Sequence, residues 1–266
     1  MTPQEHRAAA LRLDQAKRTR QQIRMISLDH PGMTVADAYA VQRAWREIEL
    51  AAGAEIVGHK IGLTSKAMQQ AVGIKEPDSG YLTTDMVWVT GMQVYAQEFI
   101  GLRVEAELAF VLKTPLSGAS LSVDDVLEAT DFVRPCLEML DTRIFRVDPE
   151  TGMGRTVLDT ISDNAANAGF AFGGRQIGPR ECDLRWVGAI VAKNGDVEET
   201  GLAAGVLGHP AEAIAWLAER LAEQGERLEP GQILLAGSFI RPIEVGRGDR
   251  IVADYGAFGD ISLDFV

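Results

Sequence analysis

The chain has 266 residues, 46% of them hydrophobic, and a formal net charge of −12 with a pI near 4.8. This length suffices for one large domain, or for a domain with a cap, around a sizeable core. The acidic balance argues against a protein that binds nucleic acid, because contacts to a phosphate backbone need clustered basic side chains.

Signals for membrane insertion and export are absent from the sequence. No run of about 18 apolar residues occurs, so no transmembrane helix is expected. The first twenty residues lack the apolar centre of a signal peptide. Cys136 and Cys182 are too few for a disulfide framework and are expected to be small buried hydrophobic groups. The sequence therefore predicts a cytoplasmic protein.

Two helices are predicted near the N-terminus. The first begins at the capping box Thr2–Glu5, which has proline at the first helical position, and is expected to run to about Met25. The second begins at Thr34, which is followed three residues later by Asp37. Gly53 is expected to end this second helix.

The stretch FIGLRVEAELAFVL, residues 99–112, alternates with period two, which is typical of a strand. One face is an unbroken apolar row, and the other carries Glu105 and Glu107 before it turns apolar. Two carboxylates two residues apart on a strand share a face, with Cα atoms roughly 6.6–7 Å apart. They could form half of a divalent-metal site; an edge strand with both acids in water is the alternative.

Other elements follow from apolar patterns and turn residues. Strands are expected over residues 55–63, 86–89, 131–140 and 184–193, with several short ones in the last forty residues. Helices are expected over Ser65–Val72, from Ser122, and from Pro210 to Gly225. Turns are expected at EPDSGYL, residues 76–82, and at Asn194-Gly195, which favours a type I′ hairpin; residues 141–168 are expected to be rich in loops.

The sum of these elements is an α+β fold. Residues 1–54 are expected to form a helical N-terminal cap, and residues 55–266 a catalytic domain that is one mainly antiparallel β barrel or roll. The 27 glycines suit a closed or rolled β structure with tight corners. Pro135 places its strand at a sheet edge or beside a bulge.

Glu138 is a third acid of interest, because its neighbours in the strand are apolar and a buried acid needs a partner. Arg134, on the same face, could supply that partner through a salt bridge, and a ligand role is equally open. Three carboxylates suit a hard divalent ion such as Mg²⁺ or Mn²⁺. Zinc is disfavoured, because the four histidines lack paired spacing.

Lys60 stands among apolar residues in a predicted strand. It could send its amine to a carboxylate or to the surface. Alternatively, it could point into a pocket where a nearby metal cation and poor solvation lower its pKa until it exchanges protons near pH 7. Asp78 could orient it or a water molecule. Thr64, Ser65 and Ser162 could bind a substrate carboxylate, or could be helix-cap and turn residues.

Three motifs that would point to other enzymes are absent. The chain contains no GxSxG, no GxxxxGK[ST] and no GxGxxG. A nucleophile elbow, a P-loop and a dinucleotide fingerprint are therefore unsupported.

Eight stretches, in order along nearly the whole chain, resemble the hydratase/decarboxylase branch of the fumarylacetoacetate hydrolase superfamily. They are GHKIGLTSKAMQ, PDSGYLTTDM, VEAELAFVL, CLEMLD, DTISDNAANAG, ETGLAAGVLGHPAEAIAWLA, LAGSFIRP and DYGAFGDISLDFV. The resemblance implies the fold of that superfamily and a homo-oligomer without an organic cofactor. It implies a Mg²⁺ site, with Mn²⁺ as a possible substitute, on Glu105, Glu107 and Glu138; acid–base roles for Lys60 and Asp78; and substrate binding by Leu63, Thr64, Ser65 and Ser162.

The resemblance also implies an activity: hydration of a 2-hydroxy-2,4-dienoate, or of its 2-oxo tautomer, in the meta-cleavage degradation of aromatic compounds. The stretch MLDTRIFRVDPETG favours members that act on a seven-carbon dioate. The second carboxylate of such a substrate would need a cationic or hydrogen-bonding anchor, for which Arg143 and Arg146 are candidates.

Three alternatives stay open. The first is a decarboxylase of a 2-oxohexenedioate that uses the same metal and lysine. The second is a non-catalytic binding module whose acids face water. The third, hydrolysis of a carbon–carbon bond in an acylpyruvate, relies on a histidine-activated water; His59 should face away from Lys60 by strand alternation, which disfavours it.

Overall fold

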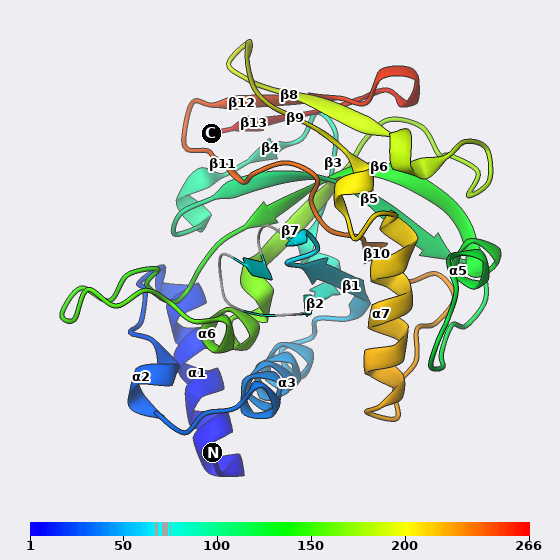
Figure 1. The fold of residues 1–266 in the computed structure, drawn as a ribbon. Coiled ribbons are helices and arrows are strands. Elements are labelled where there is room, and N and C mark those ends of the chain that lie inside the picture. The colour runs from blue at the N-terminus through cyan, green and yellow to red at the C-terminus, as the bar shows by residue number, and fades with distance from the viewer. Residues whose placement is uncertain (67–68, 71–73, 75) are drawn as a thin grey trace.

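The computed structural model describes residues 1–66, 69–70, 74 and 76–266, and its helices gather largely on one side of two β-sheets (Figure 1). The N-terminus and the C-terminus lie at opposite ends of this view. The described helices are α1 (Pro3–Thr19), α2 (Ile26–Asp29), α3 (Val35–Ala51), α5 (Val123–Ala129), α6 (Val157–Ser162) and α7 (Pro210–Ala222).

The strands form an eight-stranded sheet and a five-stranded sheet. The larger sheet contains β1 (Ile56–Gly62), β2 (Asp78–Thr83), β3 (Val87–Val89), β5 (Arg103–Leu112), β6 (Thr130–Leu140), β7 (Asn167–Phe172), β10 (Ile233–Leu235) and β11 (Ile243–Glu244). The smaller contains β4 (Gln93–Val94), β8 (Gly188–Lys193), β9 (Asp196–Leu202), β12 (Arg250–Asp254) and β13 (Asp260–Phe265).

The strand order is open in both sheets. The larger runs β2-β1-β10-β5-β6-β7-β3, with β11 paired to β5, and the smaller runs β4-β13-β12-β8-β9. Most pairings are antiparallel, whereas β1 with β10, β3 with β7 and β4 with β13 are parallel. The predicted α+β class with mainly antiparallel strands is confirmed, but the described strands form no closed barrel, so the barrel or roll is not confirmed.

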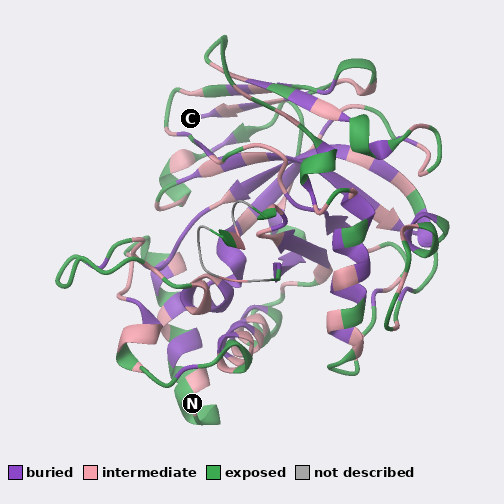
Figure 2. Cartoon of the chain, viewed as in Figure 1, coloured by how far each residue is buried: buried purple, intermediate pink, exposed green. Residues whose placement is uncertain are grey.

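The core lies on β5 and β6, where buried residues are concentrated in the middle of the larger sheet (Figure 2). Val104, Ala106, Leu108 and Phe110 of β5 are at most 1% exposed. This apolar row confirms the strand predicted from its period-two alternation. The acidic face of β5 also lies against protein, since Glu107 is fully buried.

β6 is an interior strand, so the first position expected for Pro135, a sheet edge, is wrong. The second, beside an irregularity, agrees with the register shift between Val133, opposite Ile177, and Cys136, opposite Phe172. β6 lies between β5 and β7 in the sheet order. The pairing of β6 with β7 begins only at Cys136, opposite Phe172. Pro135 therefore sits one residue outside that ladder, where its missing N–H breaks no hydrogen bond to β7.

Both predicted N-terminal helices are present with their capping boxes. The first ends at Thr19, however, and not near Met25. Arg20 takes a left-handed conformation with φ 57° and ends the helix. The following segment is drawn into β-like pairing, because the N–H of Ile23 donates to the carbonyl of Arg143 at 2.8 Å.

The turn expected at residues 76–82 is wrong, because Asp78–Thr83 is the buried strand β2. Proline, aspartate, serine and glycine resemble a turn in sequence, but here the glycine serves close packing. A Cβ on Gly80 would lie 2.7 Å from the backbone oxygen of Asn164. β2 pairs antiparallel with β1, and this pairing sets Gly80 opposite Lys60.

Most of the other predicted elements are confirmed. The helices from Ser122 and Pro210 are α5 and α7, and the Asn194-Gly195 hairpin joins β8 to β9 with both φ angles positive. β8 begins at Gly188, later than expected, because a 3-10 turn precedes it. Half of the helix predicted over Ser65–Val72, residues 67–68 and 71–72, falls outside the described residues.

The N-terminal helices are bonded to the strand that carries Asp78. Gln42 of α3 donates to the carbonyls of Ser79 and Ile161, at 2.8 Å and 2.9 Å. The hydroxyl of Tyr81 donates to Glu49 of α3 at 2.6 Å. The helical region 1–54 thus supports the site region directly.

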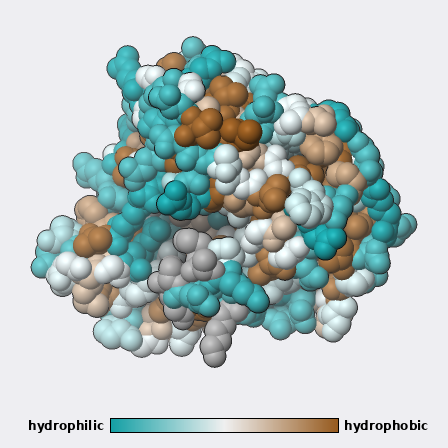
Figure 3. Space-filling view, turned by 45° about the horizontal axis from the view of Figure 1, so that its top comes forward, coloured by the Kyte–Doolittle hydropathy of each residue, from teal (hydrophilic) through white to brown (hydrophobic). Residues whose placement is uncertain are grey.

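The surface is mainly hydrophilic, with hydrophobic residues gathered on the upper part of one face (Figure 3). Among the described residues, Trp186, Ile190 and Val197 are at least half exposed. Within the same part of the chain, no helix combines the length and the apolar character needed to cross a bilayer. The homo-oligomer stays a prediction.

Candidate active site

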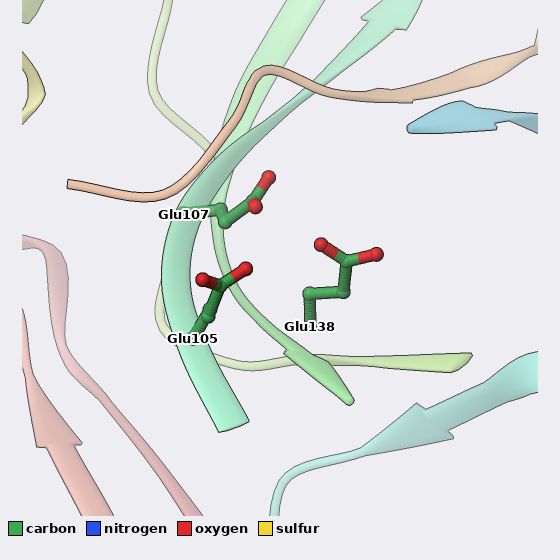
Figure 4. A group of neighbouring side chains, drawn as sticks. All are labelled: Glu105, Glu107 and Glu138. Atoms are coloured by element: carbon green, nitrogen blue, oxygen red, sulfur yellow. The ribbon is translucent and has the colours of Figure 1, made fainter. Parts of the chain in front are cut away.

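Three glutamates converge in the larger sheet. β5 carries Glu105 and Glu107, and its antiparallel register with β6 sets Glu105 directly opposite Glu138. Their side chains point toward one another (Figure 4), and one carboxylate oxygen from each lies within 4.8 Å of the others. The sheet register therefore gathers the three predicted acids.

Glu107 and Glu138 each have one carboxylate oxygen that accepts a hydrogen bond from the protein and one that does not. The backbone N–H of Gly237 donates to Oε2 of Glu107 at 2.8 Å, and Nδ2 of Asn167 donates to Oε1 of Glu138 at 2.7 Å. Oε1 of Glu107 and Oε2 of Glu138 have no hydrogen-bond partner in the described part of the chain. Buried acceptors are normally satisfied, so these two oxygens are available to a ligand.

Burial disfavours the negative charge on all three acids. Burial, followed by the neighbouring Glu138 carboxylate, raises the pKa of Glu105 to about 8. The same two causes raise the pKa of Glu107 well above its usual range, and burial raises that of Glu138. A cation would offset this repulsion. Three carboxylates without nitrogen or sulfur donors fit a hard divalent ion.

Lys60 of β1 points into this acidic group. Its Nζ lies 3.3 Å from Oε1 of Glu138 and donates to the carbonyl of Ala165 at 3.1 Å, and the residue is 3% exposed. Burial alone would lower the pKa of Lys60, but the charges of Glu138 and Asp78 outweigh it and raise the pKa. The predicted lowering of this pKa toward 7 depends on a metal cation near Lys60, so it stays a prediction.

Asp78 lies beside Lys60 across Gly62. A Cβ on Gly62 would clash with Oδ1 of Asp78 and lie 3.1 Å from Nζ of Lys60, so glycine leaves room for both side chains in these positions. Asp78 is 2% exposed, and its Oδ1 has no hydrogen-bond partner among the described residues. Burial raises the pKa of Asp78, although Lys60 opposes the shift.

The carbonyl that contacts Lys60 belongs to a strained segment. Residues 164–166 all have positive φ, between 50° and 58°, which is uncommon for side-chain-bearing residues. The guanidinium of Arg143 holds both flanks, donating to the carbonyl of Asp163 at 2.7 Å and to that of Asn167 at 3.0 Å. Arg143 thus supports the backbone that faces Lys60.

The four predicted substrate-binding residues do not share one location. Leu63 lines a cavity of about 240 Å³ that also reaches Lys60, Asp78 and Glu105. Thr64 is buried against Gly237, and Ser65 is half-buried. The hydroxyl of Ser162 donates to a carbonyl one turn earlier in α6, at 2.8 Å. Among the described residues, Leu63 is the one of these four that lines this cavity.

The two arginines considered as anchors differ. Arg143 does not line the cavity, because its guanidinium is paired with Asp163 at 2.5 Å and stacked over Trp45 at 5.1 Å. The prediction that Arg143 could anchor a substrate carboxylate is therefore wrong. Arg146 does line the cavity, and so does Arg155, which sequence reasoning missed.

Asn167 and Gly237, which bind the carboxylates, were also missed. Both lie inside stretches that carry the family resemblance, DTISDNAANAG and LAGSFIRP. Neither residue stands out by type or spacing, because an amide and a backbone N–H reveal their role only once the sheet is assembled.

The comparisons with known proteins agree with this geometry. The chain is 54% identical to 2-oxo-hept-4-ene-1,7-dioate hydratase of Escherichia coli, covering 98% of each chain. It matches the structure of 4-oxalocrotonate decarboxylase from Pseudomonas putida G7, complexed with magnesium and adipate, at TM-score 0.95 and 35% identity, covering 100% of this chain and 99% of that one.

The fold alone extends to fumarylpyruvate hydrolase of Pseudomonas aeruginosa in complex with Mn²⁺ and pyruvate, with TM-score 0.60 and 17% identity over 80% of this chain and 89% of that one. No family model matches the chain. The chain belongs to the hydratase/decarboxylase branch of the fumarylacetoacetate hydrolase superfamily.

Proposed function

We propose that the protein is a magnesium-dependent hydratase that converts 2-oxo-hept-4-ene-1,7-dioate to 4-hydroxy-2-oxoheptanedioate in the meta-cleavage degradation of aromatic compounds. The observation that carries the proposal is the full-length 54% identity to a hydratase of that name. The convergence of three glutamates beside a buried lysine supports the same chemistry.

Glu105, Glu107 and Glu138 would hold the metal, with Mg²⁺ as the ion and Mn²⁺ as a substitute. The two unpartnered carboxylate oxygens and the raised pKa values of the three acids support this assignment. When bound, such an ion supplies Lewis-acid stabilisation of negative charge at the substrate's C1 carboxylate and C2 oxygen.

Lys60 and Asp78 move the protons. The contacts of Lys60, an ion pair and a carbonyl, are those of an ammonium group, so it begins as the proton donor. Asp78, with a free Oδ1, accepts the proton that leaves C3. Lys60 delivers its proton to C5, which moves the double bond from C4–C5 to C3–C4.

Water then adds to the conjugated ketone. The hydroxyl goes to C4, the carbon β to the C2 ketone, and C3 receives a proton. The groups are then in reversed states, because Asp78 holds a proton and Lys60 has lost one. Asp78 returns its proton to C3 and Lys60 takes one from the water, so the net change is one water across the original C4–C5 bond.

Decarboxylation of 4-oxalocrotonate, a 2-oxo-3-hexenedioate, is the second candidate. It is favoured by the TM-score of 0.95 to a 4-oxalocrotonate decarboxylase. That reaction would use the same acids and the same lysine. A hydratase of 2-hydroxypenta-2,4-dienoate, which lacks the second carboxylate, is a further possibility within the same chemistry.

One experiment separates these activities. Purified protein is offered the seven-carbon dioate, 4-oxalocrotonate and 2-hydroxypenta-2,4-dienoate, each with Mg²⁺ and with chelator, while products are followed by chromatography and CO₂ release is measured. We expect the protein to hydrate the dioate. Chelator should abolish this activity, and added Mg²⁺ should restore it. Release of CO₂ without hydration of the dioate would contradict the proposed function.

A further inference from the structure

The cavity beside the carboxylates has a basic part. Three arginines line it: Arg103 at the start of β5, and Arg146 and Arg155 in the connection between β6 and α6. Lys60 and Glu105 line the same cavity. A molecule that reaches from the carboxylates into this space would therefore meet cationic side chains.

Two of these arginines already have an acidic partner. Nη2 of Arg103 lies 2.5 Å from Oε1 of Glu244, and Nη1 of Arg146 lies 3.5 Å from the same oxygen. Arg155 differs, because no carboxylate of the described residues lies within 4.0 Å of it; its Nη1 donates to the hydroxyl of Thr142 instead. Arg155 is thus a cation of the cavity wall with no ion-pair partner in the described part of the chain, although the charges of Asp163, Asp159 and Asp78 favour its protonated form.

Arg155 is held in place by neutral contacts. Its backbone N–H donates to the carbonyl of Arg146 at 2.8 Å, and Thr142, which accepts from its guanidinium, donates in turn to the carbonyl of Ile144 at 2.7 Å. The residue is half-buried, and burial lowers the pKa of its guanidinium. An unpaired, poorly solvated cation is costly, and a carboxylate offsets that cost.

We propose that Arg155 binds the second carboxylate of a dicarboxylate substrate and thereby selects dioates over monoacids. A guanidinium can bind a carboxylate through two parallel N–H donors, which fixes both position and orientation. Arg155 acts in binding, while Lys60 and Asp78 act on protons. The inference rests on the proposed function for its substrate, but it can be tested independently by binding.

The kinetic test compares two substrates in one variant. In Arg155→Gln we expect the ratio of kcat/KM for the seven-carbon dioate to that for 2-hydroxypenta-2,4-dienoate to fall about 10- to 100-fold, the usual range for a hydrogen bond to a charged group. Arg155→Lys should recover part of the ratio. Arg180→Gln changes an exposed arginine that is paired with Asp124 and does not line this cavity; it is the matched control and should change the ratio less than threefold.

The binding test does not depend on turnover. Calorimetry with Mg²⁺ present compares adipate, which has two carboxylates, with hexanoate, which has one, and circular dichroism checks that each variant is folded. Tighter binding of adipate by the wild type that is lost in Arg155→Gln and partly kept in Arg155→Lys supports the inference, even if the protein hydrates neither substrate.

Two results overturn the inference. One is a wild-type protein that binds adipate no more tightly than hexanoate. The other is a folded Arg155→Gln variant that keeps the preference for adipate. Failure of dioate hydration, with the adipate preference still lost in Arg155→Gln, overturns the proposed function and leaves the inference standing.

Discussion

The acidic and basic parts of the cavity are built differently. The acidic part is built on strands of one sheet, where backbone pairing fixes each position. β5 carries Glu105 and Glu107, β6 carries Glu138, and β1 carries Lys60. Arg155 comes from the connection before α6 and is fixed by contacts to neutral groups. The acidic part is thus set by strand register, and the basic part, apart from Arg103 of β5, by a connecting segment.

This difference separates two tasks. Strands hold side chains accurately, which suits metal binding and proton transfer, whereas connecting segments can vary without disturbing the sheet. We therefore expect changes in the acidic part to lower turnover of every substrate. Changes in the basic part should alter which substrate is preferred.

The largest expected effect is that of Lys60→Met. Loss of the proton donor should lower kcat about 10²- to 10⁴-fold, the usual contribution of general acid–base catalysis. The loss should be similar for the dioate and for the five-carbon monoacid, as steady-state kinetics would measure. Lys66→Met, which changes an exposed lysine six residues later, is the control. A large loss on the dioate alone would contradict the division of tasks.

Arg143→Gln should lower stability more than Arg146→Gln. Arg143 and Asp163 are both buried, so removal of the cation leaves a buried carboxylate unpaired and should lower the free energy of unfolding by about 3–5 kcal/mol. Arg146→Gln removes only an exposed pairing and should cost less than about 1 kcal/mol.

Urea unfolding would measure both variants, and Asp163→Asn added to Arg143→Gln should recover part of the loss. Equal effects of the two arginine variants would show that Arg143 does not support the strained segment.

His59, the neighbour of Lys60 on the opposite face of β1, gives a smaller effect. Burial, then the nearby charge of Arg46 with Glu226 opposing, lowers the pKa of His59 to about 4 from 6.5. The unfolded chain therefore binds this proton first, and the folded state loses stability as pH falls from 6.5 to 4, by about 3 kcal/mol in all and about 2 kcal/mol by pH 5.

The effect of His59 is measured by comparing the free energy of unfolding of the wild type with that of His59→Gln, at pH 7.5 and at pH 5. The advantage of the wild type should shrink by about 2 kcal/mol at the lower pH. An unchanged difference would mean that His59 is protonated, or exposed, in the folded protein.

Part of the acidic site was predictable from local pattern. Period-two alternation identified the strand of Glu105 and Glu107 and showed that they share a face, and the apolar neighbours of Glu138 marked it as an acid in need of a partner. That Glu138 lies opposite Glu105 depends on the pairing of two distant strands. The family resemblance, rather than the pattern, grouped all three.

The errors have a common physical cause. Residues 76–82 have the composition of a turn, yet tertiary packing uses Gly80 for a close approach to Asn164 and buries the segment as a strand. Arg155 carries no periodic signal, because its role arises from a cavity formed only after folding. The choice of Arg143 failed for the same reason, since its partner Asp163 is twenty residues away.

The proposed chemistry requires that Glu105, Glu107 and Glu138 bind one divalent ion. Calorimetric titration of Mg²⁺ into chelator-treated protein tests it most directly, with Glu107→Gln beside Glu128→Gln, an exposed glutamate of α5, as control. We expect one ion per chain for the wild type and the control, and binding that is weakened about 100-fold in Glu107→Gln. Unchanged Mg²⁺ binding in Glu107→Gln would contradict it.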